Sequence, residues 1–461
     1  MAVQTTNPYL EGPFAPVAEE VTATDLAVVG ALPPELDGRY LRIGPNPMEG
    51  TVGDPAAHHW FTGDGMVHGI RLRDGRAEWY RNRWVRSTRV STLLGEEPAP
   101  GERHGAMDTV NTNIIGHAGT TLALVEAGAR PVELTEELAT VRHTDLGGTL
   151  PNGFTAHPKR DPLTGELHAV AYHWSVPHLQ YIVVGTDGRV RKVVEVPVDD
   201  GPMVHDMSLT ERFAVVYDLP VTFDLESAAS GASFPYAWAP GRAARLGVLP
   251  REGTAADIRW FEVEPCYVFH PLNAYDEPGA DGGEGRMVLH VIRHERTFDA
   301  DRSGPADVTP TLWRWTVDLD RGTVTEEQLD DRAQEFPRVA ESRVGRPARY
   351  GWAAELGFTG PGDFGAGSNI IRHDLAAGTV DRHPAGASRQ VGEAVAIARD
   401  GAPADAEDDA WIMSLAHDRD TDRGELVVWA ADAPGAEPVA RVPLPARVPF
   451  GFHGSWIPTA R

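Results

Sequence analysis

Short apolar runs recur along the chain, and each is bounded by residues that favour turns. Six such runs span residues 122–126, 168–172, 180–184, 213–217, 286–292 and 425–429. The turns between runs contain Asp-Gly or X-Gly pairs, at residues 73–76, 161–165, 186–189, 320–322 and 376–378. Glycine there supplies the positive φ that a tight hairpin requires. The pattern predicts an all-β protein of repeated antiparallel meanders with few helices.

The length of the chain, 461 residues, exceeds the usual size of one domain. No Ser/Gly linker or charge block divides it, so we predict a single β-propeller domain over residues 1–461. The sequence shows no WD-type repeat, and its turn spacing also fits a large jelly roll. We favour the propeller, because it brings many strand ends to one axis.

Four histidines far apart in the chain stand in turn-like or strand-end settings. They are His157 in FTAHPK, His205 in MVHD, His270 in FHPLNAYD and His453 in FGFHGSW. Neutral imidazole is the commonest protein ligand of first-row transition metals, so these residues are predicted to form one metal site. Asp206 follows His205 directly, and we expect it to cap a turn rather than to bind the metal.

The remaining histidines are expected to pack and to form hydrogen bonds without binding metal. They are His58, His59, His68, His104, His117, His143, His168, His173, His178, His290, His294, His373, His383 and His417. Cys266 is the only cysteine, so an internal disulfide is excluded, and its apolar neighbours predict a buried structural thiol.

The formal charge of −25 argues against nucleic acid and against electrostatic docking on an anionic membrane. No run approaches the ~18 apolar residues of a membrane span, and residues 1–16 lack a signal-peptide pattern. We therefore predict a cytoplasmic protein with no obligate protein partner. Residues 227–249 mix aromatic and apolar side chains with Gly, Pro and Arg. A covered loop explains this stretch better than the alternative, a shallow membrane contact for substrate uptake.

Two further motifs carry a family resemblance. Residues 42–47 read RIGPNP and residues 59–68 read HWFTGDGMVH. Together with the four histidine motifs, in this order from Gly38 to Pro458, they resemble the carotenoid cleavage oxygenase family. That family also contains stilbene-cleaving dioxygenases and the retinoid isomerase of the visual cycle. The resemblance implies a seven-bladed β-propeller with a dome of loops and short helices over an axial iron(II) site.

The resemblance also implies roles for single residues. The family's iron ligands fall on four positions of this chain, His157, His205, His270 and His453. Thr112 matches a position whose side chain projects towards an open iron site. Neutral imidazoles leave the full double charge on iron(II), so carboxylates bonded to their outer nitrogens are expected. The family places three such glutamates, which map onto Glu126, Glu335 and Glu393, the last in Gly-Glu-Ala where the family more commonly has Gly-Glu-Pro.

These assignments predict a non-haem Fe(II) dioxygenase that uses O2 as co-substrate and splits a C=C bond into two carbonyl products. Carotenoids and apocarotenoids, which are apolar and conjugated, are the expected substrates. Stilbenoids and other phenylpropenoid alkenes are the alternative. Stilbene-cleaving relatives carry a lysine directly before the first of these glutamates, and this chain has Val125 there. The apolar residue counts against a phenolic substrate.

Two readings from other classes remain as alternatives. The chain could be a non-catalytic propeller that serves as an interaction scaffold, or a zinc-dependent hydrolase. The sequence contains no Gly-x-Ser-x-Gly, no Gly-x-x-x-x-Gly-Lys, no Cys-x-x-Cys and no His-Glu-x-x-His motif. A metal assay separates the scaffold from the enzyme.

Overall fold

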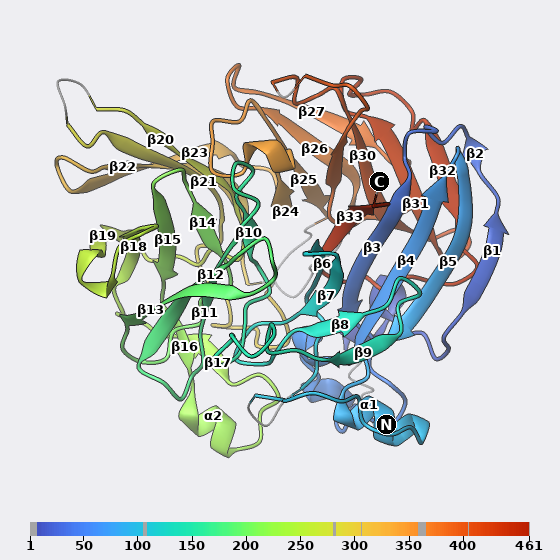
Figure 1. Ribbon diagram of the computed structural model, residues 1–461, viewed down its shortest axis with the longest axis horizontal. Coiled ribbons are helices and arrows are strands. Elements are labelled where there is room, and N and C mark those ends of the chain that lie inside the picture. The colour runs from blue at the N-terminus through green and yellow to red at the C-terminus, as the bar shows by residue number, and fades with distance from the viewer. Residues whose placement is uncertain are drawn as a thin grey trace.

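A computed structural model describes residues 7–104, 108–279, 283–305, 307–357, 366–403 and 405–460. Seven antiparallel sheets follow one another around a ring (Figure 1). The chain runs from blue strands at the right, through green at the left and orange at the top, and returns in red beside the blue strands (Figure 1). The fold is a seven-bladed β-propeller, as predicted, and the jelly-roll alternative is wrong.

Each blade is one sheet of four to six strands. The first blade contains β1 (Thr22–Leu26), β3 (Gly38–Pro45), β4 (Gly65–Arg73), β5 (Arg76–Trp84) and β33 (Gly454–Pro458). The second contains β6 (Asn113–His117), β7 (Thr120–Leu124), β8 (Val132–Leu134) and β9 (Thr140–His143). The third contains β10 (Lys159–Arg160), β11 (Leu167–Ala171), β12 (His178–Val184) and β13 (Val190–Pro197).

The fourth blade contains β14 (Met207–Leu209), β15 (Phe213–Asp218), β18 (Ala244–Pro250) and β19 (Arg259–Val263). The fifth contains β20 (Pro271–Glu277), β21 (Arg286–Arg293), β22 (Thr311–Asp318) and β23 (Thr323–Asp330). The sixth contains β24 (Gln334–Arg338), β25 (Tyr350–Leu356), β26 (Ala366–Asp374) and β27 (Thr379–Pro384). The seventh contains β2 (Val29–Gly30), β28 (Arg389–Val391), β29 (Val395–Ala398), β30 (Ala410–Asp418), β31 (Arg423–Ala430) and β32 (Ala440–Pro443). In each blade the strand nearest the ring axis lines a central cavity.

The predicted runs form strands, and the predicted turns join them. Between β4 and β5, for example, Asp74 and Gly75 have φ values of 50° and 70°, as a two-residue hairpin of this type requires. One run is longer than its strand, because β7 ends at Leu124 and the chain then turns at Ala127, where φ is 59°. Glu126 therefore lies beyond the strand that the apolar pattern predicts.

Two strand pairs close the ring. β33 pairs with β3, with Arg42 opposite Gly454, and β2 pairs with β32. A side chain at Gly454 would place its Cβ 2.4 Å from the carbonyl oxygen of Leu41, so this pairing requires glycine. The first and seventh blades thus each combine strands from opposite ends of the chain, which holds the ring together.

A dome of loops and short helices covers one end of the propeller, at the lower edge of Figure 1. It contains α1 (Thr88–Leu94), α2 (Leu225–Ala229) and the hairpin of β16 (Val221–Phe223) and β17 (Tyr236–Trp238). The described 3-10 helices are η1 (Pro8–Leu10), η2 (Gly12–Phe14), η3 (Pro55–Ala57), η4 (Trp60–Thr62), η5 (Ala255–Asp257) and η7 (Glu341–Arg343). Aromatic rings join distant segments of the dome: Trp60 stacks on Tyr9 at 5.6 Å and contacts Phe452 at 4.8 Å.

The stretch 227–249 is mixed in exposure: residues 229–233, 240, 241 and 243 are exposed, and the other residues are buried or partly buried. Leu246 and Leu249 are fully buried, and Phe234 and Trp238 pack against the same core cluster. Cys266 is buried too, and burial raises the pKa of its thiol to about 12. Within the described ranges, no helix has both the length and the apolar character that a membrane crossing demands.

Candidate metal centre

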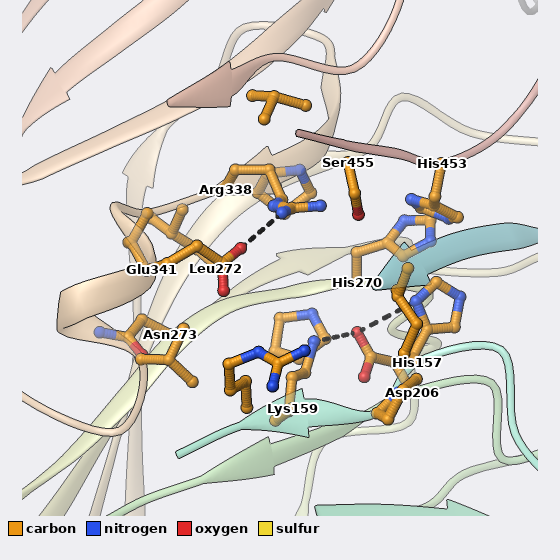
Figure 2. Close-up of a pocket in the computed structure, with 18 of the residues that line it drawn as sticks. His157, Lys159, Asp206, His270, Leu272, Asn273, Arg338, Glu341, His453 and Ser455 are labelled. Carbon is orange, nitrogen blue, oxygen red and sulfur yellow. Dashed lines mark hydrogen bonds and ion pairs between the residues drawn. The ribbon is translucent and has the colours of Figure 1, made fainter. Parts of the chain in front are cut away.

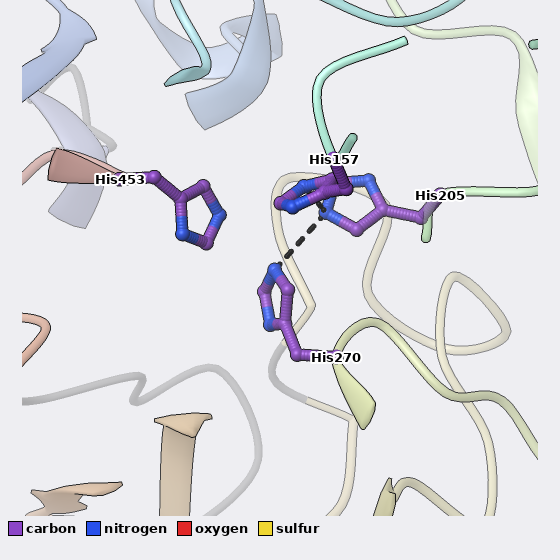
Figure 3. Close-up of side chains that lie close together, drawn as sticks. All are labelled: His157, His205, His270 and His453. Atoms are coloured by element: carbon purple, nitrogen blue, oxygen red, sulfur yellow. Dashed lines mark hydrogen bonds between the residues drawn. The ribbon is translucent and has the colours of Figure 1, made fainter. Parts of the chain in front are cut away.

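The four predicted ligand histidines meet on the propeller axis (Figure 3). Each lies one or two residues before the axial strand of a different blade, namely β10, β14, β20 and β33. All four are buried, and one ring nitrogen from each lies within 4.8 Å of the others. The Nε2 atom of His205 is 3.0 Å from that of His157 and 3.1 Å from that of His270.

This spacing fits a shared metal ion. Nitrogens that bind one ion at ~2.1 Å from right-angled positions lie ~3.0 Å apart. Burial lowers the pKa of His157 well below its usual range, and the other three imidazoles lower it further. Burial likewise lowers the pKa of His270, to about 3. Both rings are therefore neutral at pH 7, which is the form that coordinates a metal.

Three carboxylates accept hydrogen bonds from the outer nitrogens of these rings. Glu126 Oε2 lies 2.7 Å from His205 Nδ1, and Glu335 Oε2 lies 2.6 Å from His270 Nδ1. Burial lowers the pKa of His205, but the charge and hydrogen bond of Glu126, together with the charges of Asp206 and Glu335, outweigh burial, so the net shift of this pKa is upward. In the three rings that bond to a glutamate, Nδ1 is occupied by the carboxylate, so Nε2 is the nitrogen that faces the cluster.

Glu393 forms the third of these contacts, 2.9 Å from His453 Nδ1. It also accepts a hydrogen bond from the backbone N–H of Gly454 at 2.8 Å and one from Arg338 Nη1 at 3.3 Å. Burial raises the pKa of this carboxyl, but Arg338 and His453 outweigh that effect and lower it to about 2. The residue that departs from the family motif therefore lies where the resemblance placed it.

Two of the glutamates precede residues with unusual backbone conformations. Ala127 follows Glu126 with φ 59°, and Phe336 follows Glu335 with φ 56°. Side chains other than glycine adopt such angles at a cost, and these conformations cluster at functional sites. The Phe336 N–H donates to Glu335 Oε2 at 2.6 Å, so the irregular backbone also orients the carboxylate.

An apolar cavity of about 40 Å3 lies on one side of the histidine cluster. Its aromatic walls are Trp60, Phe61, Phe269, Phe336 and Phe452. Thr112 lines it as well, with its hydroxyl donating to Asn111 Oδ1 at 2.9 Å. Val125 does not border the described part of this cavity and packs against an apolar cluster that includes Leu41 and Ile43.

A second cavity, of about 370 Å3, occupies the propeller axis on the other side of the cluster (Figure 2). The axial strands of all seven blades line it. Two ion pairs lie in its wall, Lys159 with Asp206 at 2.7 Å and Arg338 with Glu341 at 2.7 Å. His270 and His453 border both cavities, so the histidine cluster separates an apolar space from one lined by both apolar and charged side chains.

Sequence reasoning missed several contacts of the centre. His294, expected to pack and to form hydrogen bonds without binding metal, has its Nε2 3.0 Å from Glu335 Oε1, a partner that the sequence did not identify. Asp206 was expected to cap a turn, and it does accept from the Met207 N–H at 2.6 Å, but its other oxygen binds Lys159. The chain before β14 is not a strand, so His205 and Asp206 need not point to opposite faces. No motif marks His294 or Arg338.

Comparison with known proteins decides the family. The model of the retinal pigment epithelial membrane protein family matches residues 14–458. A carotenoid cleavage oxygenase from Mycobacterium tuberculosis is 47% identical, with 99% of each chain covered. The chain belongs to the carotenoid cleavage oxygenase family. Carotenoid 9,10(9′,10′)-cleavage dioxygenase 1 of Arabidopsis thaliana is 32% identical over 97% of this chain and 89% of its own.

Solved structures of carotenoid cleavage oxygenases and related enzymes share the fold. A lignostilbene dioxygenase from Pseudomonas brassicacearum superposes with a TM-score of 0.86 at 28% identity, covering 98% of both chains. A cobalt-substituted apocarotenoid oxygenase from Synechocystis has a TM-score of 0.83 at 28% identity, covering 96% of this chain and 97% of its own. The chain is accordingly an oxidoreductase of the carotenoid cleavage dioxygenase type.

Proposed function

We propose that this enzyme is a non-haem iron(II) dioxygenase that cleaves a C=C bond of a carotenoid or apocarotenoid with O2 into two carbonyl products. One observation carries the proposal: four buried imidazoles converge beside an apolar cavity, and three of them donate to carboxylates, of which Glu335 and Glu393 are buried and Glu126 is partly buried. Four neutral ligands without a carboxylate among them suit iron(II) that keeps open positions. Bound iron supplies the activation of O2 beside the alkene.

The residues of the chain have separate tasks in this proposal. The ligands are His157, His205, His270 and His453. Glu126, Glu335 and Glu393 orient their rings and balance the charge of the ion. Thr112 lines the apolar cavity beside His205 and His453, where its side chain limits what reaches an open position. In this proposal no side chain has to donate or remove a proton.

The apolar wall favours a polyene as the substrate. Aromatic side chains on the cavity exclude water and pack on a conjugated chain. The cavity, at about 40 Å3, holds only the reacting segment of such a chain. The named relatives include carotenoid and apocarotenoid oxygenases, which agrees with this substrate class.

A stilbenoid substrate is the second candidate, because the lignostilbene dioxygenase superposes over nearly the whole chain. Its phenolic substrates would need a cation or a hydrogen-bond donor near the reacting double bond. Val125 provides neither. We therefore rank carotenoids and apocarotenoids first.

The test begins with anaerobic loading of the purified protein with iron(II) and measurement of the bound metal. The loaded protein is then incubated in air with carotenoids, apocarotenals and stilbenes, and products are identified by mass spectrometry, with 18O2 to trace both oxygens. We expect one iron per chain and paired carbonyl products from an apocarotenal. Protein that binds no stoichiometric iron would support the scaffold alternative. Cleavage of stilbenes alone would reverse the substrate ranking.

The ligand assignment is tested with alanine at each of the four histidines. Each variant should lose iron and cleavage, because three imidazoles hold iron(II) poorly in a site built for four. His290→Ala is the matched control, since His290 is an equally buried histidine in β21 outside the cluster. A ligand variant that retains iron and activity as the control does would remove that histidine from the site.

A further inference from the structure

The four imidazoles differ in what their outer nitrogens meet. His205, His270 and His453 each have a glutamate within 2.9 Å of Nδ1. Among the described residues, the carboxylate nearest to His157 Nδ1 is Asp206, whose Oδ2 is 3.8 Å away. That distance is too long for a hydrogen bond. It is short enough that a shift of ~1 Å would form one.

The setting of Asp206 suits a partner of His157. Its side chain is 2% exposed, and it stands beside His157 in the wall of the axial cavity (Figure 2). Oδ1 accepts from the Met207 N–H at 2.6 Å, which fixes the carboxylate to the backbone at the start of β14. Oδ2, the oxygen that faces His157, binds Lys159 Nζ at 2.7 Å. Lys159 compensates the charge of an otherwise isolated buried carboxylate.

We infer that Asp206 is the positioning residue of His157, the counterpart of the three glutamates. In this inference Lys159 keeps the Asp206 carboxylate ionised and close to His157. A metal that binds His157 through Nε2 withdraws electrons from the ring and makes its Nδ1–H a stronger donor. Asp206 Oδ2 is the acceptor within reach. The inference rests on the proposed metal site, and its test reads metal binding rather than cleavage.

The test uses the cobalt(II)-loaded full-length protein, because cobalt reports its coordination through visible absorption. Two quantities are measured for each variant: this spectrum and the rate at which a chelator removes the metal. Loss of an outer-shell partner of a metal ligand typically weakens binding ~10- to 100-fold. We expect Asp206→Asn to release cobalt at least about tenfold faster than wild type and to change the spectrum.

Asp218→Asn is the matched control. Asp218 ends β15 in the same blade, is 1% exposed, and is paired with Arg242 at 2.6 Å. It is not among the residues that border the axial cavity. This variant should lose thermal stability yet keep the wild-type release rate and spectrum. If Asp206→Asn behaves as Asp218→Asn does, Asp206 is a structural residue and the inference is wrong.

Lys159→Met distinguishes the ion pair from the carboxylate. It breaks the same pair as Asp206→Asn but leaves the carboxylate free to move towards His157. We expect the metal-free protein to melt at a lower temperature, while cobalt is released at the wild-type rate or more slowly. Release at least about tenfold faster than from wild type would show that the pair matters only as a scaffold. Because this comparison is with wild type, it would overturn the inference even if Asp206→Asn fails to fold.

Failure of the proposed function gives a different result. Wild-type protein that binds neither iron nor cobalt contradicts the metal site itself. Wild-type protein that binds cobalt, with Asp206→Asn unchanged in spectrum and release, contradicts only the role of Asp206. Asp206→Glu adds a check, since its extra carbon–carbon bond of ~1.5 Å brings the carboxylate towards Nδ1. This variant should restore slow release.

Discussion

At the scale of single residues, Glu335 is the carboxylate of the site whose replacement should disturb several hydrogen bonds at once. It accepts from His270, from His294 and from the Phe336 N–H. Glutamine has the same shape, but its amide NH2 group takes the place of one carboxylate oxygen. At least one of the three N–H donors then faces another donor and loses its acceptor. We expect Glu335→Gln to weaken metal binding by ~10- to 100-fold. The effect should be larger than that of Glu126→Gln, which disturbs the hydrogen bond with His205. Isothermal titration with cobalt(II) measures both.

Val125→Lys tests the substrate ranking. A lysine ammonium can donate a charge-assisted hydrogen bond worth ~1.5–3 kcal/mol to a phenol. The ratio of kcat/KM for a 4-hydroxystilbene to that for an apocarotenal should therefore rise. Val125 packs against an apolar cluster, so the variant should also melt at a lower temperature. Val125 itself does not border the described part of the cavity. An unchanged ratio in a folded variant would therefore mean that the longer lysine side chain does not reach the substrate either.

Sequence reasoning found the residues that lie in recognisable motifs and missed those that do not. His157, His205, His270 and His453 stand in motifs, and the structure brings them together as expected. His294 reaches Glu335 only through the packing of β21 against β24, and such tertiary contacts leave no local pattern. His294→Ala is therefore expected to weaken metal binding, whereas no part in the metal site was expected for this residue from the sequence.

At the scale of elements, the pairing of β33 with β3 is the sensitive point. A methyl group at Gly454 would meet the carbonyl oxygen of Leu41 at 2.4 Å, and backbone cannot move aside as a side chain can. Gly454→Ala should cost ~1–3 kcal/mol of stability. It should also weaken metal binding, since Gly454 follows His453 and donates to Glu393.

Gly53→Ala is the control for this element, because a Cβ there meets nothing within 4 Å. It should leave the melting temperature and metal binding unchanged. A Gly454→Ala variant that matches this control in both measurements would show that the strand pair tolerates the added carbon.

The strands themselves could be predicted, because alternation of apolar and polar residues and Gly-containing turns are local properties. Their number per blade, the closure of the ring by β33 and β2, and the split of the last axial strand into β28 and β29 could not. Those features depend on which distant segments pair. The seven-bladed arrangement came from the family resemblance, since residue spacing alone left a jelly roll open.

At the scale of the whole molecule, buried histidines make the fold sensitive to acid. Burial lowers the pKa to about 3 for His59 and His68 and to about 4 for His168, His290, His373 and His383. Below pH ~6.5 the unfolded chain binds protons that these folded residues do not. Their contribution is therefore complete above pH ~6.5 and is lost as the pH falls towards 4.

The free energy of unfolding of the metal-free protein should accordingly fall steeply between pH 7 and pH 5. Below pH ~6, each of these histidines lowers it by up to ~1.4 kcal/mol per pH unit. Thermal melts followed by circular dichroism at several pH values measure this. A melting temperature that stays constant across the interval would contradict the burial of neutral rings.

The closure of the ring by β33 also sets an order of events during biosynthesis. The ribosome delivers His157, His205 and His270 first, while His453 follows only after the strands of the seventh blade have been translated. Domains fold as their segments emerge, amino-terminal part first. A nascent chain that has not yet reached β33 therefore contains three of the four histidines and lacks His453. In the proposed site, iron would have its full set of protein ligands only once translation has passed the last strand, which would make metal loading a post-translational step.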